Sequence, residues 1–145
     1  MAEQILPQVQ ADVRTAMKAG ERDRAAALRM VVDALQQDAK LGKGDEIAVL
    51  QRERKMRLEA AEAFAKGGRG EQADTERSEA EMISTYLPAQ LSDEELDALV
   101  SAAIEETGAS EQRQMGEVMS ALMPKVGGRA DGKRVSQAVR EKLGA

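Results

Sequence analysis

The sequence predicts an all-α fold, with an N-terminal domain resembling a four-helix bundle followed by a small three-helix tail domain. Apolar residues recur at helical spacing along the 145 residues, and no segment shows the two-residue alternation of a strand. The apolar side chains are mostly Ala, Leu, Val and Met, which suit closely packed helices. Aromatic residues, which sheets favour, make up only 1% of the chain.

The predicted N-terminal domain, residues 1–88, contains four amphipathic helices with short connections, which favour antiparallel neighbours. Glycine or proline follows each helix, and Asp45 is the expected N-cap of the third. The expected helices span, in order, about Ile5 to Ala19, Arg22 to Leu41, Glu46 to the Gly67–Gly70 turn, and from that turn to Leu87, before Pro88. The second connection is short and reads Leu41-Gly42-Lys43-Gly44.

Three shorter helices form the predicted tail domain, residues 89–145. Ser92 and Glu95 have the spacing of a capping box, in which each side chain accepts a hydrogen bond from the other residue's backbone N–H. Ser110 is the expected cap of the next helix, and Asp131 is the expected cap of the last.

The chain contains no cysteine and no histidine. This excludes disulfides, thiolate nucleophiles, imidazole bases and the usual zinc sites. The carboxylates are numerous, but none stands in an apolar context with a partner that would mark an acid–base pair. We therefore name no catalytic residue, and we expect neither a metal nor another cofactor.

The N-terminus has no basic segment, and no stretch approaches the roughly 20 apolar residues of a membrane span. We expect a cytoplasmic protein without a membrane partner.

The net charge of −5 argues against a polyanionic partner, and no DNA binding is expected. The charge is unevenly distributed, however. Residues 92–112 carry seven acids and no base, whereas residues 113–145 carry seven Lys or Arg against three acids. The basic end of the chain is therefore a candidate phosphate-facing surface, although the scarcity of aromatic residues leaves few platforms on which bases could stack.

Residues 127–133 match the phosphate-loop pattern G-x-x-x-x-G-K, but Arg134 stands where that loop needs Ser or Thr. The segment also follows a helix instead of a strand, so we interpret it as a turn at a helix N-terminus. Such a turn can still contact RNA phosphate, because helix-end amides favour anions. The candidate RNA-binding residues are Lys125, Arg129, Lys133 and Arg134.

A second basic surface is predicted on the third helix, at Arg52, Arg54, Lys55 and Arg57. Helical spacing places Arg52 and Lys55 on a solvated face and the other two at the margin of the apolar stripe. The structural interpretation is that these two guanidinium groups contact acids of the fourth helix, such as Glu76. The functional interpretation is a groove for RNA backbone or for a partner carboxylate.

Several segments together carry a family resemblance that covers nearly the whole chain. The most specific are Tyr86-Leu87-Pro88-Ala89-Gln90-Leu91-Ser92, Met115-Gly116-Glu117-Val118-Met119 and Gly128-Arg129-Ala130-Asp131-Gly132. Supporting segments are Leu28-Arg29-Met30, Val49-Leu50-Gln51-Arg52-Glu53 and Glu62-Ala63-Phe64-Ala65-Lys66-Gly67-Gly68-Arg69. In this order they resemble the GatB/YqeY family, whose free-standing members are relatives of the tail of GatB, a component of the tRNA-dependent amidotransferase.

The resemblance implies a helical bundle with a helical tail and a role associated with translation. In GatB, the tail region follows the catalytic cradle and helps to hold the tRNA whose mischarged Glu or Asp is converted to Gln or Asn. The cradle has no counterpart in 145 residues. The resemblance therefore implies a non-catalytic accessory module that binds tRNA.

Two alternatives stay open. One is a helical protein–protein adaptor for an amidotransferase subunit or an aminoacyl-tRNA synthetase, which the acidic net charge favours. The other is participation in a carbon–nitrogen ligase system with glutamine as amido donor, against which the missing cradle, cysteine and histidine argue.

Overall fold

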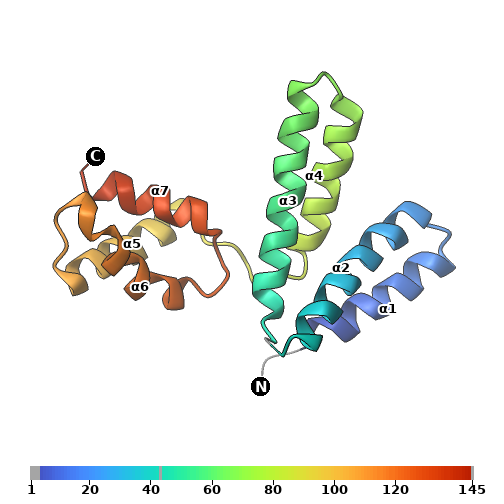
Figure 1. Ribbon diagram of the computed structural model, residues 1–145, viewed down its shortest axis with the longest axis horizontal. Helices are drawn as coiled ribbons and strands as arrows, with labels where there is room; N and C mark the ends of the chain where they lie inside the picture. Colours follow the sequence, from blue (N-terminus) through green and yellow to red (C-terminus); the bar gives the residue numbers. More distant parts are fainter. Residues whose placement is uncertain (1–3, 43, 145) are drawn as a thin grey trace. The chain divides into compact units, whose positions relative to one another are not determined.

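A computed structural model describes residues 4–42 and 44–144, and every regular element in these ranges is a helix (Figure 1). The predicted all-α fold class is confirmed. Contacts between residues divide the chain into two compact units, Met1–Leu87 and Pro88–Ala145. Lys43, in the predicted connection between the second and third helices, lies outside the described residues.

The first unit consists of two helical hairpins. Helix α1 (Ile5–Lys18) packs against α2 (Arg22–Lys40), and α3 (Glu46–Lys66) packs against α4 (Gly70–Ser84). In Figure 1 the two hairpins diverge from a common base, where the end of α2 meets the start of α3.

The core of the first unit lies at this base. Residues from all four helices are fully buried there, and they include Val9, Leu28, Leu50 and Ile83. Farther along the α3–α4 hairpin, the buried residues are the small Ala61, Ala73 and Ala80. Hydrophobic stabilisation scales with buried apolar area, so it is concentrated at the base and weaker toward the hairpin tip.

The predicted start of α3 is confirmed, whereas α4 ends earlier than predicted. The Asp45 side chain accepts a hydrogen bond of 3.0 Å from the Ala48 N–H. Helix α4 stops at Ser84, and the chain then tightens into turns that lead to Pro88. A residue that precedes proline avoids the helical conformation, so the helix ends before Leu87.

A glutamate at the start of α3 caps α1 across the base of the unit. The two carboxylate oxygens of Glu46 each accept a 2.8 Å hydrogen bond, one from the backbone N–H of Ile5 and one from that of Leu6. These N–H groups open α1 and have no acceptor within the helix. The negative charge also suits the positive end of the helix dipole.

We expect Glu46→Ala to lower the free energy of unfolding of the first unit by about 1 to 3 kcal/mol, because two partly buried N–H groups lose their acceptors. Urea unfolding followed by circular dichroism measures this loss. Glu59→Ala, at an exposed position of the same helix, is the control and should change the free energy by less than about 0.5 kcal/mol. Equal effects of the two substitutions would contradict the capping role.

The sole tyrosine joins the end of the first unit to α1. The Tyr86 hydroxyl donates a 2.5 Å hydrogen bond to the Asp12 carboxylate, and its ring packs against the core at the base. Burial raises the pKa of Tyr86 above the ordinary value of 10.0, and the hydrogen bond to Asp12 and its negative charge add to this. The fold therefore favours the neutral phenol.

Because the folded-state pKa of Tyr86 is raised, its contribution to stability should be complete below about pH 10 and lost as the pH rises through the folded-state pKa. Ultraviolet absorbance of tyrosinate reports Tyr86 alone, since the chain has one tyrosine and no tryptophan. We expect the tyrosinate midpoint above 10 in the folded protein, near 10 in denaturant, and closer to 10 in Asp12→Asn. Identical midpoints in folded and unfolded protein would contradict this contact.

The second unit contains α5 (Asp93–Thr107), a short 3-10 turn η1 (Gln112–Gln114), α6 (Met115–Val126) and α7 (Gly132–Lys142). The helices enclose one core. Its buried residues are Leu91, Leu96, Val100, Ala103, Ala109, Val118, Leu122, Val126, Ala130, Val135, Val139 and Leu143.

Two of the three predicted caps in this unit are confirmed. Ser92 and Glu95 form both hydrogen bonds of the capping box, and the Asp131 side chain accepts from the Arg134 N–H at 2.9 Å. The prediction of Ser110 as the cap of α6 is wrong. Its own N–H donates to the Gln114 side chain at 2.9 Å, and η1 precedes α6.

Candidate nucleic-acid interface

The predicted RNA-binding residues lie in or beside the turn between α6 and α7. Lys125 is in the last turn of α6, Lys133 and Arg134 are at the start of α7, and Arg129 lies in the turn itself. The turn begins with Gly127 and Gly128, which have φ angles of 56° and 82°. This left-handed conformation is strained for other residues, and two such residues in succession reverse the chain within a short turn. Asp131 then caps α7, so the turn opens directly onto a helix N-terminus.

Hydrogen bonds tie this turn to the segment that precedes α5. The Leu91 N–H donates to the Arg129 carbonyl at 2.8 Å. In the opposite direction, the Arg134 Nη1 donates to the Leu91 carbonyl, also at 2.8 Å. The side chains of Leu91 and Ala130 are buried in the core beside these bonds. Backbone and core contacts therefore fix the shape of the turn.

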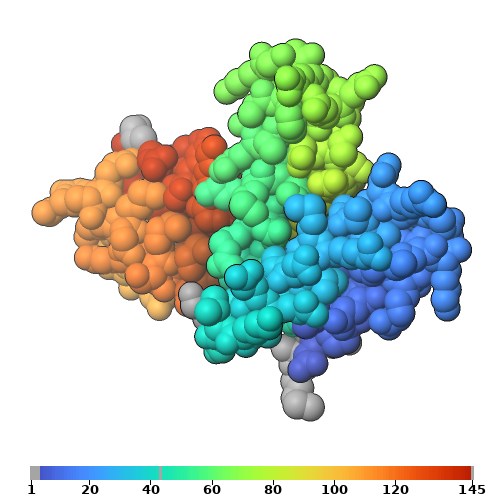
Figure 2. All heavy atoms as spheres, turned by 45° about the vertical axis from the view of Figure 1, so that its right-hand side comes forward, coloured from blue at the N-terminus to red at the C-terminus, as the bar shows by residue number. Residues whose placement is uncertain are grey.

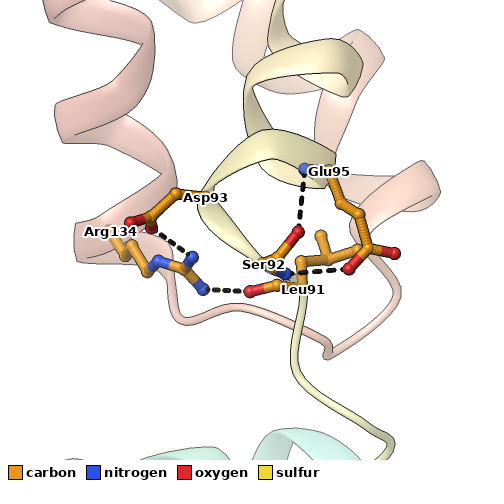
Figure 3. Close-up of polar contacts among 5 residues, drawn as sticks. All are labelled: Leu91, Ser92, Asp93, Glu95 and Arg134. Carbon is orange, nitrogen blue, oxygen red and sulfur yellow. Dashed lines mark hydrogen bonds and ion pairs between the residues drawn. The ribbon is translucent and has the colours of Figure 1, made fainter.

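Arg134 is engaged within the fold (Figure 3). Besides its bond to Leu91, its Nη2 contacts the Asp93 carboxylate at 2.8 Å, and its side chain is 33% exposed. The guanidinium group thus links α7 to the start of α5. Helical spacing alone gave no sign of this role, because Leu91 lies 43 residues away in sequence.

Arg129 is half-buried and closes the end of α6. Its Nε donates to the Val126 carbonyl at 3.1 Å and its Nη2 to the Lys125 carbonyl at 2.8 Å. These carbonyls end the helix, where a cation is favourable. Arg129 is thus oriented by the turn, and no described hydrogen bond uses its Nη1.

The two lysines of the predicted site remain accessible. Lys125 is exposed and forms a 2.7 Å ion pair with Glu106, whose side chain is also exposed. Exposed pairs of this kind contribute about 0 to 1 kcal/mol, so Lys125 can exchange Glu106 for a phosphate at little cost. Lys133 is exposed in the first turn of α7, and the structure describes no hydrogen bond or ion pair for its side chain.

Acidic groups limit the positive field around the turn. The pKa of Glu95 is lowered by the hydrogen bond from the Ser92 backbone N–H, by the hydrogen bond with the Ser92 side chain and by the charge of Arg129. This carboxylate therefore stays ionised. A groove of about 740 Å³ between α5 and α7 carries both signs of charge, and Lys142 contacts Asp97 there at 2.9 Å. This groove therefore offers no purely positive surface for phosphate.

The second basic surface consists of two exposed residues and two residues bonded to α4, as its helical spacing predicted. Arg52 and Lys55 are exposed. Arg54 donates to the Ser84 hydroxyl at 2.7 Å, and Arg57 forms a 3.2 Å ion pair with Glu79.

The prediction that Glu76 receives one of these arginines is wrong. The antiparallel register brings Glu79 to the level of Arg57, whereas Glu76 lies one turn nearer the hairpin tip. The Oε2 atom of Glu76 is buried without a hydrogen-bond partner among the described residues. Burial raises the pKa of Glu79, Arg57 opposes this, and Glu76 adds to the rise.

Residues 4–42 and 44–144 were compared with the requirements of a metal site and of a membrane-spanning helix. No group of three or more Asp, Glu, His or Cys side chains in these ranges could hold a metal ion. No helix in the same ranges is long and apolar enough to cross a membrane.

Comparison with known proteins places the chain in a family. The family model described as Yqey-like protein matches residues 6–143. The chain belongs to the YqeY family. One relative of this YqeY-family chain is altered inheritance of mitochondria protein 41, a mitochondrial protein of Pyrenophora tritici-repentis (strain Pt-1C-BFP). The two are 26% identical over 151 residues, which cover 97% of this chain and 82% of the relative.

Two of the segments on which the YqeY resemblance rests meet in the structure. Leu91 belongs to the Tyr86–Ser92 segment and Arg129 to the Gly128–Gly132 segment, and the backbone hydrogen bond between them joins the two. In this YqeY-family chain, these segments therefore form the framework of the basic turn.

Proposed function

We propose that the chain is a non-catalytic accessory module that binds tRNA and is related to the tail of GatB in the glutamine-dependent tRNA amidotransferase. Membership of the YqeY family supports the relationship. The contact surface in this proposal is the α6–α7 turn, with Lys125, Arg129 and Lys133 contacting phosphates. Arg134 holds the turn in place.

The observation that carries the proposal is the exposed Lys133 in the first turn of α7, without a described partner of its own. A helix N-terminus already favours anions, and a free lysine beside it adds a full positive charge. Lys125 lies in the last turn of α6, and Arg129, whose Nη1 has no described hydrogen bond, lies in the connection that follows. Such phosphate contacts fix position on RNA but discriminate poorly between sequences.

A protein–protein adaptor is the second candidate. Two observations favour it. Lys125, Arg129 and Arg134 already contact groups of this chain, and the net charge of the chain is −5. Its partner would be an amidotransferase subunit or an aminoacyl-tRNA synthetase. Participation in carbon–nitrogen ligation with glutamine as amido donor is a further candidate only within such a complex, because the chain has no cysteine, histidine or catalytic cradle of its own.

Charge reversal tests the first proposal. We expect Lys125→Glu/Lys133→Glu to weaken binding to unfractionated tRNA at low salt by about tenfold or more, because two phosphate contacts become repulsive. Fluorescence anisotropy with labelled tRNA measures the affinity, and circular dichroism checks that helicity is unchanged.

Arg52→Glu/Lys55→Glu is the matched control, since both its positions are exposed and its charge change is the same. It should weaken binding much less. Equal losses would move the contact surface toward α3. Equal affinities for all three proteins, or no binding by any of them, would favour the adaptor.

A further inference from the structure

A groove lies between α2 and α4 in the first unit, where the two hairpins diverge. Its volume is about 620 Å³, and its walls come from the start of α2 and from most of α4. Figure 2 shows the α3–α4 hairpin (green) rising above the α1–α2 hairpin (blue). The groove is separate from the basic turn, which belongs to the second unit.

Apolar side chains form part of the groove lining. Ala27 of α2 is buried there, and Met82 of α4 is partly buried against the core. Outside the lining itself, Met30 lies one turn beyond Ala27 on α2 and is 52% exposed. Its sulfur lies 3.7 Å from Nη2 of Arg57, whose Nε contacts the groove residue Glu79. Exposed methionine adapts to the shape of a partner, and it favours apolar contacts.

The charged lining is predominantly acidic. The lining contains four acids and one base. The acids are Asp23, Asp74, Glu79 and Glu81, and the base is Arg24. Three of these five groups already have partners, because Arg24 contacts Glu21, Asp74 contacts Arg77 and Glu79 contacts Arg57. Asp23 and Glu81 are exposed, on opposite walls, with no ion pair described for either. Four acids against one base give the lining an excess of negative charge, and the two acids without a described ion pair stand on opposite walls.

We propose that this groove binds a basic amphipathic helix of a partner protein. The apolar face of that helix would contact Ala27, Met30 and Met82, and its lysines or arginines would contact Asp23 on one wall and Glu81 on the other. Helix-in-groove binding uses this combination of an apolar strip and complementary charge. The α4 lining extends from Asp74 to Thr85, about 16 Å at 1.5 Å per residue, which matches about three turns of helix.

The acidic lining repels phosphate, so the same groove does not suit RNA. The inference goes beyond the proposed tRNA contact, since it concerns the other unit and another class of partner. Either can fail without the other.

The test uses the full-length protein and a synthetic helical peptide of about 16 residues, with leucine on one face and lysine on the other. We expect saturable binding by fluorescence anisotropy, weakened about tenfold or more in Asp23→Lys/Glu81→Lys because two favourable charge contacts become repulsive. Amide shifts of the bound protein should concentrate at Ala27, Ser78 and Met82. A peptide with glutamate in place of lysine should not bind.

Glu59→Lys/Glu62→Lys is the matched control, with the same charge change at exposed positions of α3 outside the groove lining. It should retain most of the affinity. Equal weakening by the two double variants, binding of the glutamate peptide, or amide shifts elsewhere would overturn the proposal. Circular dichroism of both variants distinguishes loss of binding from loss of fold.

Discussion

Leu28→Ala should be among the most destabilising single substitutions in the first unit. Leu28 is fully buried at the base, where α1, α2, α3 and α4 share a core. Removing its buried side chain costs transfer free energy and leaves a cavity, together about 2 to 5 kcal/mol. For a unit of this size, such a loss lowers the melting temperature by more than about 10 °C.

Leu41→Ala provides the matched control, because Leu41 follows α2 directly and is 68% exposed. The same chemical change should there alter the free energy of unfolding by less than about 0.5 kcal/mol. Thermal unfolding followed by circular dichroism compares the two variants. Similar losses for both would mean that the shared core at the base does not stabilise the first unit as described.

Leu122→Ala should lower the free energy of unfolding of the second unit by a comparable amount. This loss should be a larger share of the total stability of that unit. Leu122 is fully buried between α5, α6 and α7. A domain of the size of residues 88–145 has a total stability of roughly 3 to 9 kcal/mol, so a loss of 2 to 5 kcal/mol removes a large part of it. We propose that the two units unfold separately, and we expect this variant to unfold the second unit first.

Amide spectra resolve the two units and so test this expectation. Signals from α5, α6 and α7 should collapse in Leu122→Ala at a temperature where those of α1 to α4 stay dispersed. The neighbouring Met123, which is 37% exposed, supplies the control Met123→Ala, with a much smaller expected effect. Simultaneous loss of both sets of signals would show that the units unfold together.

Local signals in the sequence predicted local structure correctly. Asp45, Asp131 and the Ser92–Glu95 pair cap helices because each bonds to groups within three residues, and that spacing is visible in the sequence. Ser110 failed because the next residue, Glu111, takes the cap position of η1 and forms a capping box with Gln114. Several donors and acceptors near one helix start are locally equivalent, and packing decides between them.

Contacts between distant residues could not be predicted in this way. Glu46 caps a helix 40 residues away, and Arg134 binds a carbonyl 43 residues away. Both roles depend on how the helices pack, whereas periodicity indicates only which face of each helix is buried. For the candidate site, the sequence located the basic turn but not the division between its bonded arginines and its accessible lysines.

The salt dependence of tRNA binding tests the central claim most directly. Binding through Lys125, Arg129 and Lys133 corresponds to about three phosphate contacts, each contributing about 0.7 to 0.9 to the slope of log affinity against log salt. The proposed module should therefore bind tRNA weakly, with a slope of about −2 to −3, and the slope should flatten in Lys125→Glu/Lys133→Glu. Absence of binding at low salt, or a slope near zero, would contradict the account.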